Sequence, residues 1–286
     1  MITSKTSFLA LIGNPVNHSL SPIMQNAAIK YLGLDLVYLA FPCKDKDFTA
    51  TINALKKINC RGLNITIPYK ERVFNLCNKI TPNANKIKAI NTLRLDVNNE
   101  WNGTNTDIAG FIYPLNKFNL INKKGTILGS GGAARAAIQG LLELNLAEIN
   151  VISRNEESLK KIKSDFSEDQ QINTVMHTEK ITSELIGDAD LIVNSTPVGM
   201  SRSSKTEDSL PFGQKIWESL KSNTIIYDLI YNPRPTDLLK YGINKGCITI
   251  DGLEMLVAQG AQSLSYWTNG LEVPTEIMKN ALKNHI

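Results

Sequence analysis

Lys70 is the residue of this chain whose position most favours chemistry, because it closely follows a short strand-like run. Within residues 63–67, apolar positions alternate with Asn64 and Thr66. Successive side chains of a strand point to opposite faces, so these two polar side chains are expected to share one face. Pro68 has no N–H to give to a sheet and ends the strand, and residues 69–73 are predicted to form the first turn of a helix.

A lysine at such a junction has two interpretations. Open α/β sheets bind their ligands outside the carboxyl ends of the strands, so Lys70 would face a bound molecule. The alternative is a solvated lysine at the start of an ordinary surface helix, since lysines are mostly exposed in proteins. The segment alone leaves both interpretations open.

A glycine-rich segment over residues 128–137, with the sequence LGSGGAARAA, forms a second candidate site. It follows a predicted strand over 125–128 and opens a predicted helix over 132–144. Glycines in this context let backbone N–H groups approach a pyrophosphate at the positive end of the helix. The segment therefore predicts a dinucleotide site. The alternatives are a glycine-rich turn that binds nothing and a site for another nucleotide, such as S-adenosylmethionine.

The end of the next predicted strand, over 148–153, indicates which dinucleotide is bound. NAD-binding proteins usually place an acidic residue there, whereas this chain has Ser153, Arg154 and Asn155. The fork of an arginine suits a 2′-phosphate, so NADP is favoured. Glu156 and Glu157 are interpreted as acidic residues at a helix N-terminus. NAD remains an alternative if they turn towards the ribose.

Two further predicted strands also end in polar residues, in segments 194–200 (NSTPVGM) and 228–231 (DLIY). The first is expected to form a wall near the nicotinamide. Ordinary strand-terminating turns would give the same composition.

The remaining pattern consists of the elements that must position these residues. Strands over 8–12, 36–41 and 63–67 alternate with helices over 22–32 and 47–58, which predicts a parallel sheet. A strand over 89–96 and a polar loop over 103–107 follow. After a helix over 108–118, a second βαβ series is predicted, with strands over 125–128, 148–153, 191–194, 224–228 and 247–250 and a helix over 236–245.

The C-terminal region is predicted to form two helices, over 252–268 and 274–284, without an intervening strand. They are expected to pack back on the first domain. Residues 201–209, rich in serine and charge, are predicted to be a mobile surface loop. The expected domains are therefore 1–106 joined by 252–286, and 107–251.

Length and composition agree with a soluble globular protein of two domains. The chain has 286 residues, a net charge of +4 and no basic run that would bind nucleic acid. Its apolar runs are too short for a signal peptide or a membrane span, so a cytoplasmic location is expected. The four cysteines form no C-x-x-C pair and the three histidines are dispersed, which predicts free thiols and no metal site.

These segments together resemble the shikimate dehydrogenase family, in content and in order. The resemblance spans essentially the whole chain. Besides the glycine-rich loop and the two polar strand ends, it is carried by residues 18–22 (HSLSP), 64–70 (NITIPYK), 89–92 (AINT), 103–107 (GTNTD) and 251–259 (DGLEMLVAQ).

The resemblance implies an α/β substrate domain followed by a Rossmann-like, doubly wound NADP domain. It implies the reversible NADPH-dependent reduction of 3-dehydroshikimate to shikimate, in aromatic amino acid biosynthesis. Lys70 and Asp107 would be the catalytic pair. The implied substrate-binding residues are Ser19, Ser21, Asn64, Thr66, Lys70, Asn91, Asp107, Tyr231 and Gln259. The implied cofactor-binding residues are Gly129, Ser130, Gly131, Gly132, Ala133, Ser153, Arg154, Asn155, Leu229 and Gly252.

One departure from the family pattern concerns the 2′-phosphate. Many members carry a second arginine four positions after the first, and this chain has Ser158 there. The 2′-phosphate site is then either weaker or supplemented by Lys160.

Other readings also remain open. Asp107 could serve only as a helix N-cap, Gln259 could lie on an exposed helix face, and His18 is interpreted as a loop-stabilising residue.

The alternative functions are a quinate/shikimate dehydrogenase that uses NAD and a non-catalytic NADP-binding sensor. The expected partner is the small substrate alone, with no nucleic acid and no membrane, for a monomer or homodimer.

Overall fold

The computed structural model describes residues 2–58, 60–200 and 209–286. The chain divides into two compact units. Unit 1 comprises Met1–Gly110 with Leu256–His285, and unit 2 comprises Phe111–Met255. The expected mobile loop over 201–209 lies outside the described residues, except for Ser209.

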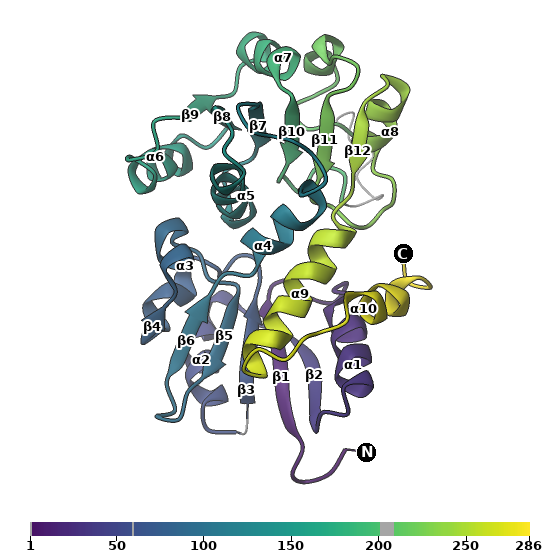
Figure 1. Cartoon of the computed structure of the whole chain (residues 1–286). Helices are drawn as coiled ribbons and strands as arrows, with labels where there is room; N and C mark the ends of the chain where they lie inside the picture. The colour runs from purple at the N-terminus through teal and green to yellow at the C-terminus, as the bar shows by residue number, and fades with distance from the viewer. Residues whose placement is uncertain (1, 59, 201–208) are drawn as a thin grey trace. The chain divides into compact units, whose positions relative to one another are not determined.

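Unit 1 contains a six-stranded sheet in the order β2-β1-β3-β5-β6-β4 (Figure 1). β1 pairs in parallel with β2 and β3, and β5 runs antiparallel to β3 and β6. The predicted βαβαβ start is confirmed, and the antiparallel strands make the sheet mixed. The strands are β1 (Ser7–Gly13), β2 (Leu36–Pro42), β3 (Cys60–Ile65), β4 (Lys79–Ile80), β5 (Thr92–Leu95) and β6 (Trp101–Thr104), and the helices between them are α1 (Ser21–Tyr31), α2 (Phe48–Leu55) and α3 (Pro82–Ile87).

The segment that carries Lys70 differs from the prediction. β3 ends at Ile65, and the N–H of Tyr69 donates to the carbonyl of Thr66 at 2.9 Å, which closes a turn. The predicted helical turn at 69–73 is present as a single hydrogen bond, from the N–H of Val73 to the carbonyl of Tyr69 at 3.0 Å, and the chain then continues as a 3-10 helix over Arg72–Leu76 rather than as an α-helix. The predicted loop over 103–107 is partly wrong, since Gly103 and Thr104 pair in β6.

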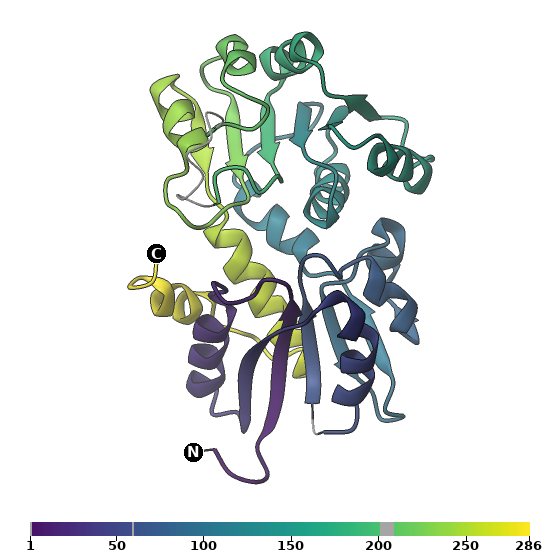
Figure 2. The same cartoon turned by 180° about the vertical axis from the view of Figure 1, so that it is seen from behind.

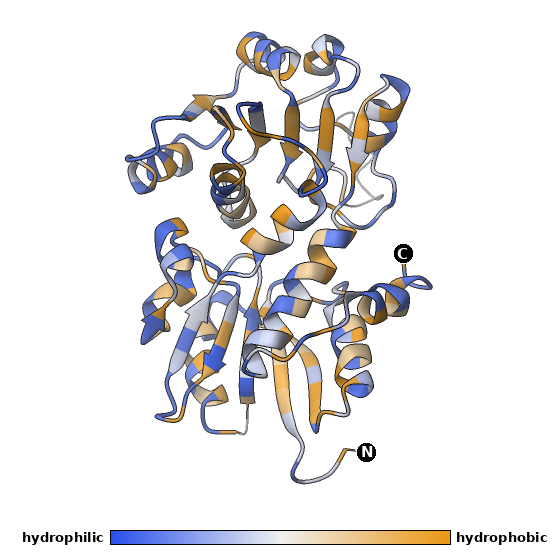
Figure 3. Ribbon diagram, viewed as in Figure 1, coloured by the Kyte–Doolittle hydropathy of each residue, from blue (hydrophilic) through white to orange (hydrophobic). Residues whose placement is uncertain are grey.

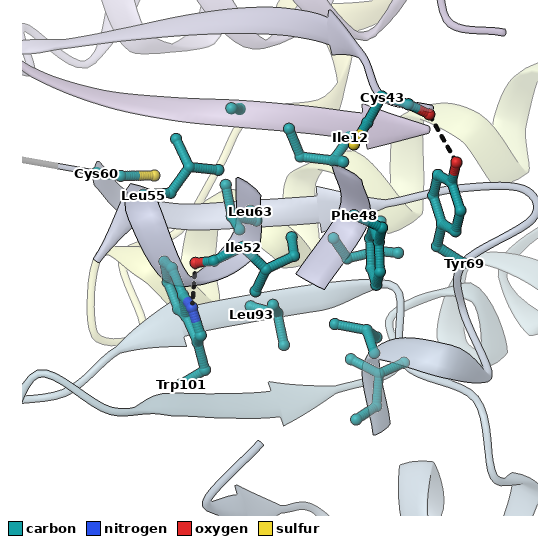
Figure 4. Packing of buried hydrophobic residues seen from close by; sticks show 14 of the residues in the cluster. Ile12, Cys43, Phe48, Ile52, Leu55, Cys60, Leu63, Tyr69, Leu93 and Trp101 are labelled. Atoms are coloured by element: carbon teal, nitrogen blue, oxygen red, sulfur yellow. Dashed lines mark hydrogen bonds between the residues drawn. The ribbon is translucent and has the colours of Figure 1, made fainter. Parts of the chain in front are cut away.

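The core of unit 1 holds this turn in place (Figure 4). The ring of Tyr69 stacks on Phe48 with 4.2 Å between centroids, and its hydroxyl donates to the carbonyl of Cys43 at 2.6 Å. At the opposite end of this core, Trp101 donates its Nε1–H to the carbonyl of Ile52 at 3.1 Å (Figure 4). Tyr69 is only 1% exposed, so the residue before Lys70 is buried in the core and fixes the position of the turn.

Two C-terminal helices, α9 (Leu253–Trp267) and α10 (Thr275–Leu282), complete unit 1 from Leu256 onwards. Trp267 donates its Nε1–H to the carbonyl of Leu93 in β5 at 2.7 Å. Its indole leaves no room for a Cβ at position 62 of β3, which explains the glycine there. Gln25 of α1 donates to the carbonyl of Gly260 at 2.8 Å, and α10 also packs on α1.

Unit 2 contains a second six-stranded sheet, in the order β12-β11-β10-β7-β8-β9, in which all pairs are parallel. The strand order reverses between β7 and β10, and such a switch point is where doubly wound sheets bind nucleotides. The predicted Rossmann-like topology is confirmed. The strands are β7 (Lys124–Leu128), β8 (Glu148–Ser153), β9 (Ile172–Met176), β10 (Leu191–Asn194), β11 (Ile225–Asp228) and β12 (Ile248–Ile250).

Helices α5 (Gly132–Glu143), α6 (Glu156–Asp165), α7 (Glu179–Asp188) and α8 (Asp237–Asn244) connect these strands. Figures 1 and 2 show α6 at one end of the sheet and α8 at the other. β10 and β11 are apolar almost throughout, whereas α8 alternates between apolar and polar residues (Figure 3). This contrast is typical of a parallel sheet whose faces are covered by amphipathic helices.

Two predictions in this region need correction. No strand was predicted between 153 and 191, yet β9 lies there, with the half-polar sequence INTVM. The helix predicted over 108–118 is shorter: α4 spans Asp107–Ile112 and passes into a 3-10 turn that contains Pro114. Proline cannot donate the N–H that a continuing helix requires.

Candidate active site

Lys70 and Asp107 form a largely buried ion pair in unit 1. Nζ of Lys70 lies 2.6 Å from Oδ2 of Asp107, and the two side chains are 15% and 8% exposed. The backbone of Lys70 is held as well, since its carbonyl accepts from the N–H of Ile90 at 2.8 Å. A short ion pair with little solvent is a strong, well-ordered contact.

Asp107 is the first residue of α4 rather than its N-cap. The side chain of Asn105 accepts from the N–H of Asp107 at 2.9 Å. The carboxylate of Asp107 bonds to Lys70 through Oδ2 and to Nδ2 of Asn91 through Oδ1, the latter at 2.9 Å. Both of its oxygens are thus used on neighbouring side chains that carry N–H donors.

Asn91 has a fixed amide orientation. Its Oδ1 accepts from the N–H of Thr106 at 2.8 Å and from the hydroxyl of Thr92 at 2.9 Å. Two donors on this oxygen require that the NH₂ group face Asp107. The structure therefore brings Lys70, Asp107 and Asn91 together as one hydrogen-bonded set.

Asn64, on β3, joins this set to Ser21. Its amide donates to the carbonyl of Asn91 at 3.1 Å, and its Oδ1 accepts from the hydroxyl of Tyr38 at 2.8 Å. The hydroxyl of Ser21 also bonds to Tyr38, and burial raises the pKa of this phenol far above its ordinary value. A continuous chain of side chains thus runs from Ser21 through Tyr38 and Asn64 to Asn91.

Ser263 of α9 lies at the centre of a buried hydroxyl cluster. Its Oγ is 2.9 Å from the hydroxyl of Thr92 and 3.0 Å from that of Thr106, and Asn64 donates to it at 3.1 Å. It also donates to the carbonyl of Gln259, one helical turn earlier, at 2.9 Å. Ser263, Thr92 and Tyr38 were not among the residues expected at this site. The one available signal was the i, i+4 spacing of Gln259 and Ser263, which places them on one helix face.

Of the other residues expected at this site, Ser19, Thr66 and Gln259 are in unit 1, and none of them bonds directly to the ion pair among the hydrogen bonds of the described chain. Thr66 is half-buried, and its methyl group occupies the space that a side chain at Gly13 would need. Ser19 accepts from the N–H of Ser21 at 3.2 Å. The amide of Gln259 donates to the carbonyl of Leu256 at 2.8 Å. Tyr231 belongs to unit 2.

The glycine-rich loop of unit 2 has the geometry of an anion site. Gly129 has φ +108°, and a Cβ there would lie 2.6 Å from Oγ of Ser195. Gly131 is the N-cap of α5 without a side-chain hydrogen bond, and a Cβ at this position would meet open space. By contrast, Asn155, Thr178 and Thr236 cap α6, α7 and α8. The first-turn N–H groups of α5 are thus free of side-chain caps and can bind an anionic ligand.

Ser153, which ends β8, and the two residues after it make different contacts. Ser153 accepts from the hydroxyl of Ser130 at 2.8 Å and from the N–H of Asn155 at 3.1 Å, so these three residues fix the loop geometry. The side chain of Asn155 is used as the cap of α6. The Arg154 side chain is exposed, with its guanidinium carbon 5.2 Å from the ring centroid of Phe212.

Glu156 and Glu157, the acidic residues that could bind the ribose of NAD, form ion pairs within α6 instead. Glu156 pairs with Lys160 at 2.8 Å, and Glu157 pairs with Lys161 at 3.0 Å, both along α6. This geometry agrees with their interpretation as helix N-terminal acids. It also occupies Lys160, the residue considered as a supplement to Arg154.

A buried carboxylate organises the ends of β10 and β11. Asp228 is fully buried and accepts from Nδ2 of Asn194 at 2.9 Å, the N–H of Ile230 at 3.1 Å and the hydroxyl of Thr236 at 2.7 Å. Burial raises its pKa to about 6 despite these donors. Beside it, Gly252 lies so close to the backbone of Leu229 that any side chain would clash with the Leu229 carbonyl.

Across the described residues, no group of histidine, cysteine or acidic side chains has the arrangement of a metal site. In the same part of the chain, no helix is long and apolar enough to cross a membrane.

Known proteins resemble this chain over its full length. Residues 11–93 match the model of the shikimate dehydrogenase substrate binding domain, and residues 252–283 match that of the shikimate 5'-dehydrogenase C-terminal domain. A protein of Prochlorococcus marinus (strain MIT 9215) named shikimate dehydrogenase (NADP(+)) is 62% identical over 286 residues, which covers 100% of both chains.

Two solved structures are similar in fold. One is a shikimate dehydrogenase in complex with NADP+, with 33% identity, a TM-score of 0.88 and coverage of 100% of this chain and 98% of that one. The other is a shikimate 5-dehydrogenase from Listeria monocytogenes in complex with shikimate and NAD, with 32% identity, a TM-score of 0.85 and coverage of 98% of each chain.

Proposed function

Because the chain belongs to the shikimate dehydrogenase family, we propose that it catalyses the reversible NADPH-dependent reduction of 3-dehydroshikimate to shikimate, in aromatic amino acid biosynthesis. The observation that carries the proposal is the 2.6 Å contact between Nζ of Lys70 and Oδ2 of Asp107. Carbonyl reduction needs a group that stabilises and protonates the oxygen on which negative charge develops. An ammonium held by a carboxylate at low exposure can do both. A sensor that only bound NADP would have no use for this pair.

The roles of the two domains follow from their contents. We assign substrate binding to residues 1–106 with the C-terminal helices over 252–286, and cofactor binding to residues 107–251. Lys70 and Asn91 support the first assignment, since both bond to Asp107, the residue at the boundary, within unit 1. The uncapped helix α5 after a glycine-rich loop supports the second.

In the proposed reaction, the reduced nicotinamide supplies a hydride to the ketone carbon. Negative charge then develops on the carbonyl oxygen, and the Lys70 ammonium stabilises this charge and donates a proton from Nζ. Asp107 holds Nζ in place and accepts from the hydroxyl that forms. Asn91 fixes Asp107 by its bond to Oδ1.

The polar side chains of unit 1 suit a polyhydroxylated carboxylic acid. We assign Ser19 and Ser21 to the carboxylate, and Thr66, Asn91 and Gln259 to ring hydroxyls. A site whose donors match the hydroxyls of its substrate rejects analogues that lack them. Tyr231 is a further proposed substrate contact.

Asn64 is proposed to have a positioning role in addition to the substrate contact that the family resemblance implies. Its amide bonds to Tyr38, Asn91, Thr92 and Ser263. We propose that Asn64 positions Asn91 through its bond to the carbonyl of that residue and is also a substrate contact.

The residues of unit 2 fit NADP. Gly129, Ser130, Gly131, Gly132 and Ala133 would place backbone N–H groups at the pyrophosphate, because α5 carries no side-chain cap. Arg154 would bind the 2′-phosphate, since its exposed guanidinium has no carboxylate partner among the ion pairs of the described residues. Ser153 and Asn155 shape this loop, and Leu229 and Gly252 would lie near the nicotinamide.

A quinate/shikimate dehydrogenase that uses NAD is the second candidate, because the similar Listeria monocytogenes protein was solved with shikimate and NAD. The two candidates differ in substrate and cofactor preference. The test is the rate of nicotinamide reduction, followed by absorbance, with shikimate or quinate and with NADP+ or NAD+. The proposal predicts the highest kcat/KM with shikimate and NADP+. Preference for quinate or NAD+ would support the second candidate, and no turnover with any pair would refute both.

We also propose a cytoplasmic enzyme that acts as a monomer or homodimer. Its four cysteines are all free, which is typical of reducing compartments. Light scattering coupled to gel filtration would decide the oligomeric state.

A further inference from the structure

A histidine lies beside the proposed 2′-phosphate ligand. His177 directly follows β9, and its backbone N–H donates to the carbonyl of Ser153 at 2.9 Å. Ser153 ends β8 and precedes Arg154. The carboxyl ends of β8 and β9 therefore place Arg154 and His177 at the same edge of the sheet in unit 2.

Phe212 brings the two side chains into one cluster. The imidazole of His177 stacks on the Phe212 ring, with 4.4 Å between centroids and 24° between planes. The guanidinium carbon of Arg154 lies 5.2 Å from the centroid of that ring. The Phe212 ring thus contacts both the guanidinium of Arg154 and the imidazole of His177.

The imidazole is also fixed in its own plane. Nδ1 of His177 lies 2.9 Å from Oγ1 of Thr182, a fully buried residue of α7. When the ring is protonated, both nitrogens donate, and Nδ1 is already committed to Thr182. Nε2–H is then the donor available to an anion.

We propose that His177 is a second ligand of the 2′-phosphate of NADP, next to Arg154, and that it contributes a pH-dependent part of the preference for NADP over NAD. The inference rests on the proposed function, because it assumes that this edge of the sheet binds a dinucleotide. In this proposal, His177, which follows the neighbouring strand β9, takes the place of the second arginine that many family members carry and this chain lacks. Lys160 is a weaker candidate, since it pairs with Glu156 at 2.8 Å.

The charges around His177 explain why its contribution depends on pH. Burial and the nearby Arg154 lower the pKa of His177, while Glu179 of α7 raises it by a smaller effect. Glu179 is itself paired with Lys215 at 2.6 Å. The free protein therefore holds His177 mostly neutral at neutral pH, and a phosphate dianion would stabilise the imidazolium. Binding of NADP+ should then take up a proton at this ring.

The test is calorimetric titration of NADP+ and NAD+ into wild type and His177→Phe, at about pH 6 and about pH 8, near and above the ordinary pKa of histidine. Phenylalanine keeps the stack on Phe212 and removes the proton. His177→Asn is the second variant, because its amide can still reach Thr182 while the stack is lost. Arg154→Met is the positive control, with weaker NADP+ binding expected at both pH values.

We expect both His177 variants to bind NADP+ about three- to tenfold more weakly than wild type at about pH 6, the size of a partly exposed charged contact. At about pH 8 the loss should be less than about twofold, and the Kd for NAD+ should not change. Titrations in two buffers of different ionisation enthalpy should show more proton uptake for wild type than for His177→Phe. Run at about pH 7, above the second pKa of about 6 of a phosphate monoester, these titrations keep the 2′-phosphate mostly dianionic in both proteins, so the difference reports mainly the imidazole.

Three results would overturn the inference: equal weakening of NADP+ and NAD+, a loss that does not depend on pH, or variants indistinguishable from wild type. In the third case, tight NADP+ binding by wild type would leave the proposed function intact. Failure of wild type to bind NADP+ at all would instead refute the proposed function, and the inference with it.

Discussion

Asp107 accepts from Nζ of Lys70 on one carboxylate oxygen, at 2.6 Å, and from Nδ2 of Asn91 on the other, at 2.9 Å. The lysine reaches it from the turn after β3, and the asparagine from the residue before β5. The Asp107 carboxylate thus joins side chains from two other segments of the chain. This arrangement keeps an ammonium group in one position at low exposure, where it acts more strongly on developing charge than in water.

Replacement of Asp107 by asparagine should lower kcat about a hundredfold or more, since it removes the charge that holds Nζ while keeping the size of the side chain. The measurement is steady-state kinetics with shikimate and NADP+. Glu100→Gln is a matched control, because Glu100 pairs with Lys56 at 2.8 Å in the same unit. A kcat for Asp107→Asn close to that of the control would contradict the assigned role.

Replacement of Asn91 tests whether the position of Asp107 matters. Asn91→Ala removes the bond to Oδ1 and leaves Thr92 and Thr106 with one acceptor fewer. Both kcat and KM for shikimate should worsen, by about tenfold each, because Asn91 is also a proposed substrate contact. The Kd for NADP+ should be unchanged, and a variant that lost affinity for both ligands would indicate general misfolding instead.

The sequence predicted the parts of this arrangement that depend on local pattern. The β1–β3 series, the glycine-rich loop and Lys70 after Pro68 all follow from alternation, proline and glycine within a few residues. Ser263 and Tyr38 were missed because their roles depend on contacts with Asn64 from distant segments of the chain. The family resemblance, rather than any pattern, connected Lys70 with Asp107.

The errors have physical causes of the same kind. β9 has alternating polar residues and only five positions, so its pairing with β8 stabilises a strand that its composition does not indicate. After β3, proline at 68 suggested the start of an α-helix, but only one i→i+4 hydrogen bond forms, from Val73 to Tyr69, before the chain tightens into a 3-10 helix at Arg72.

Two glycines of the cofactor loop should respond differently to alanine. Gly129→Ala should destabilise the protein by about 1–3 kcal/mol, because its φ of +108° disfavours a side chain and the new Cβ meets Ser195. Gly131→Ala should leave the free energy of unfolding nearly unchanged, since open space surrounds that Cβ. It should nevertheless weaken NADP+ binding, because a bound pyrophosphate would occupy this space. Chemical denaturation and calorimetry measure the two effects, and unchanged NADP+ affinity in Gly131→Ala would refute the placement.

Asp228 should make stability depend on pH in an unusual direction. Burial raises its pKa from 3.8 to about 6, with a smaller contribution from Asp251, so the folded state prefers the neutral acid. Its contribution to the free energy of unfolding should therefore fall as pH rises from about 4 to about 6, by up to about 3 kcal/mol, and stay constant above that range.

Asp228→Asn tests this expectation, since its Oδ1 can still accept from Asn194 and Ile230 while its Nδ2 donates to Thr236. The stability of this variant relative to wild type should increase over the same pH range and then level off. Urea denaturation at several pH values measures it. A stability difference that is constant with pH would show that Asp228 does not titrate in this range.

Kinetics of Lys70→Ala test the central claim most directly, with Lys56→Ala as the matched control. Lys56 has a similar exposure, 17% against 15%, and a similar ion pair, but lies outside the proposed site. We predict that kcat with shikimate and NADP+ falls about a thousandfold in Lys70→Ala, with little change in KM, and that Lys56→Ala keeps wild-type kcat. A folded Lys70→Ala protein that turns over at a rate close to wild type would contradict the assignment of Lys70 as the proton donor.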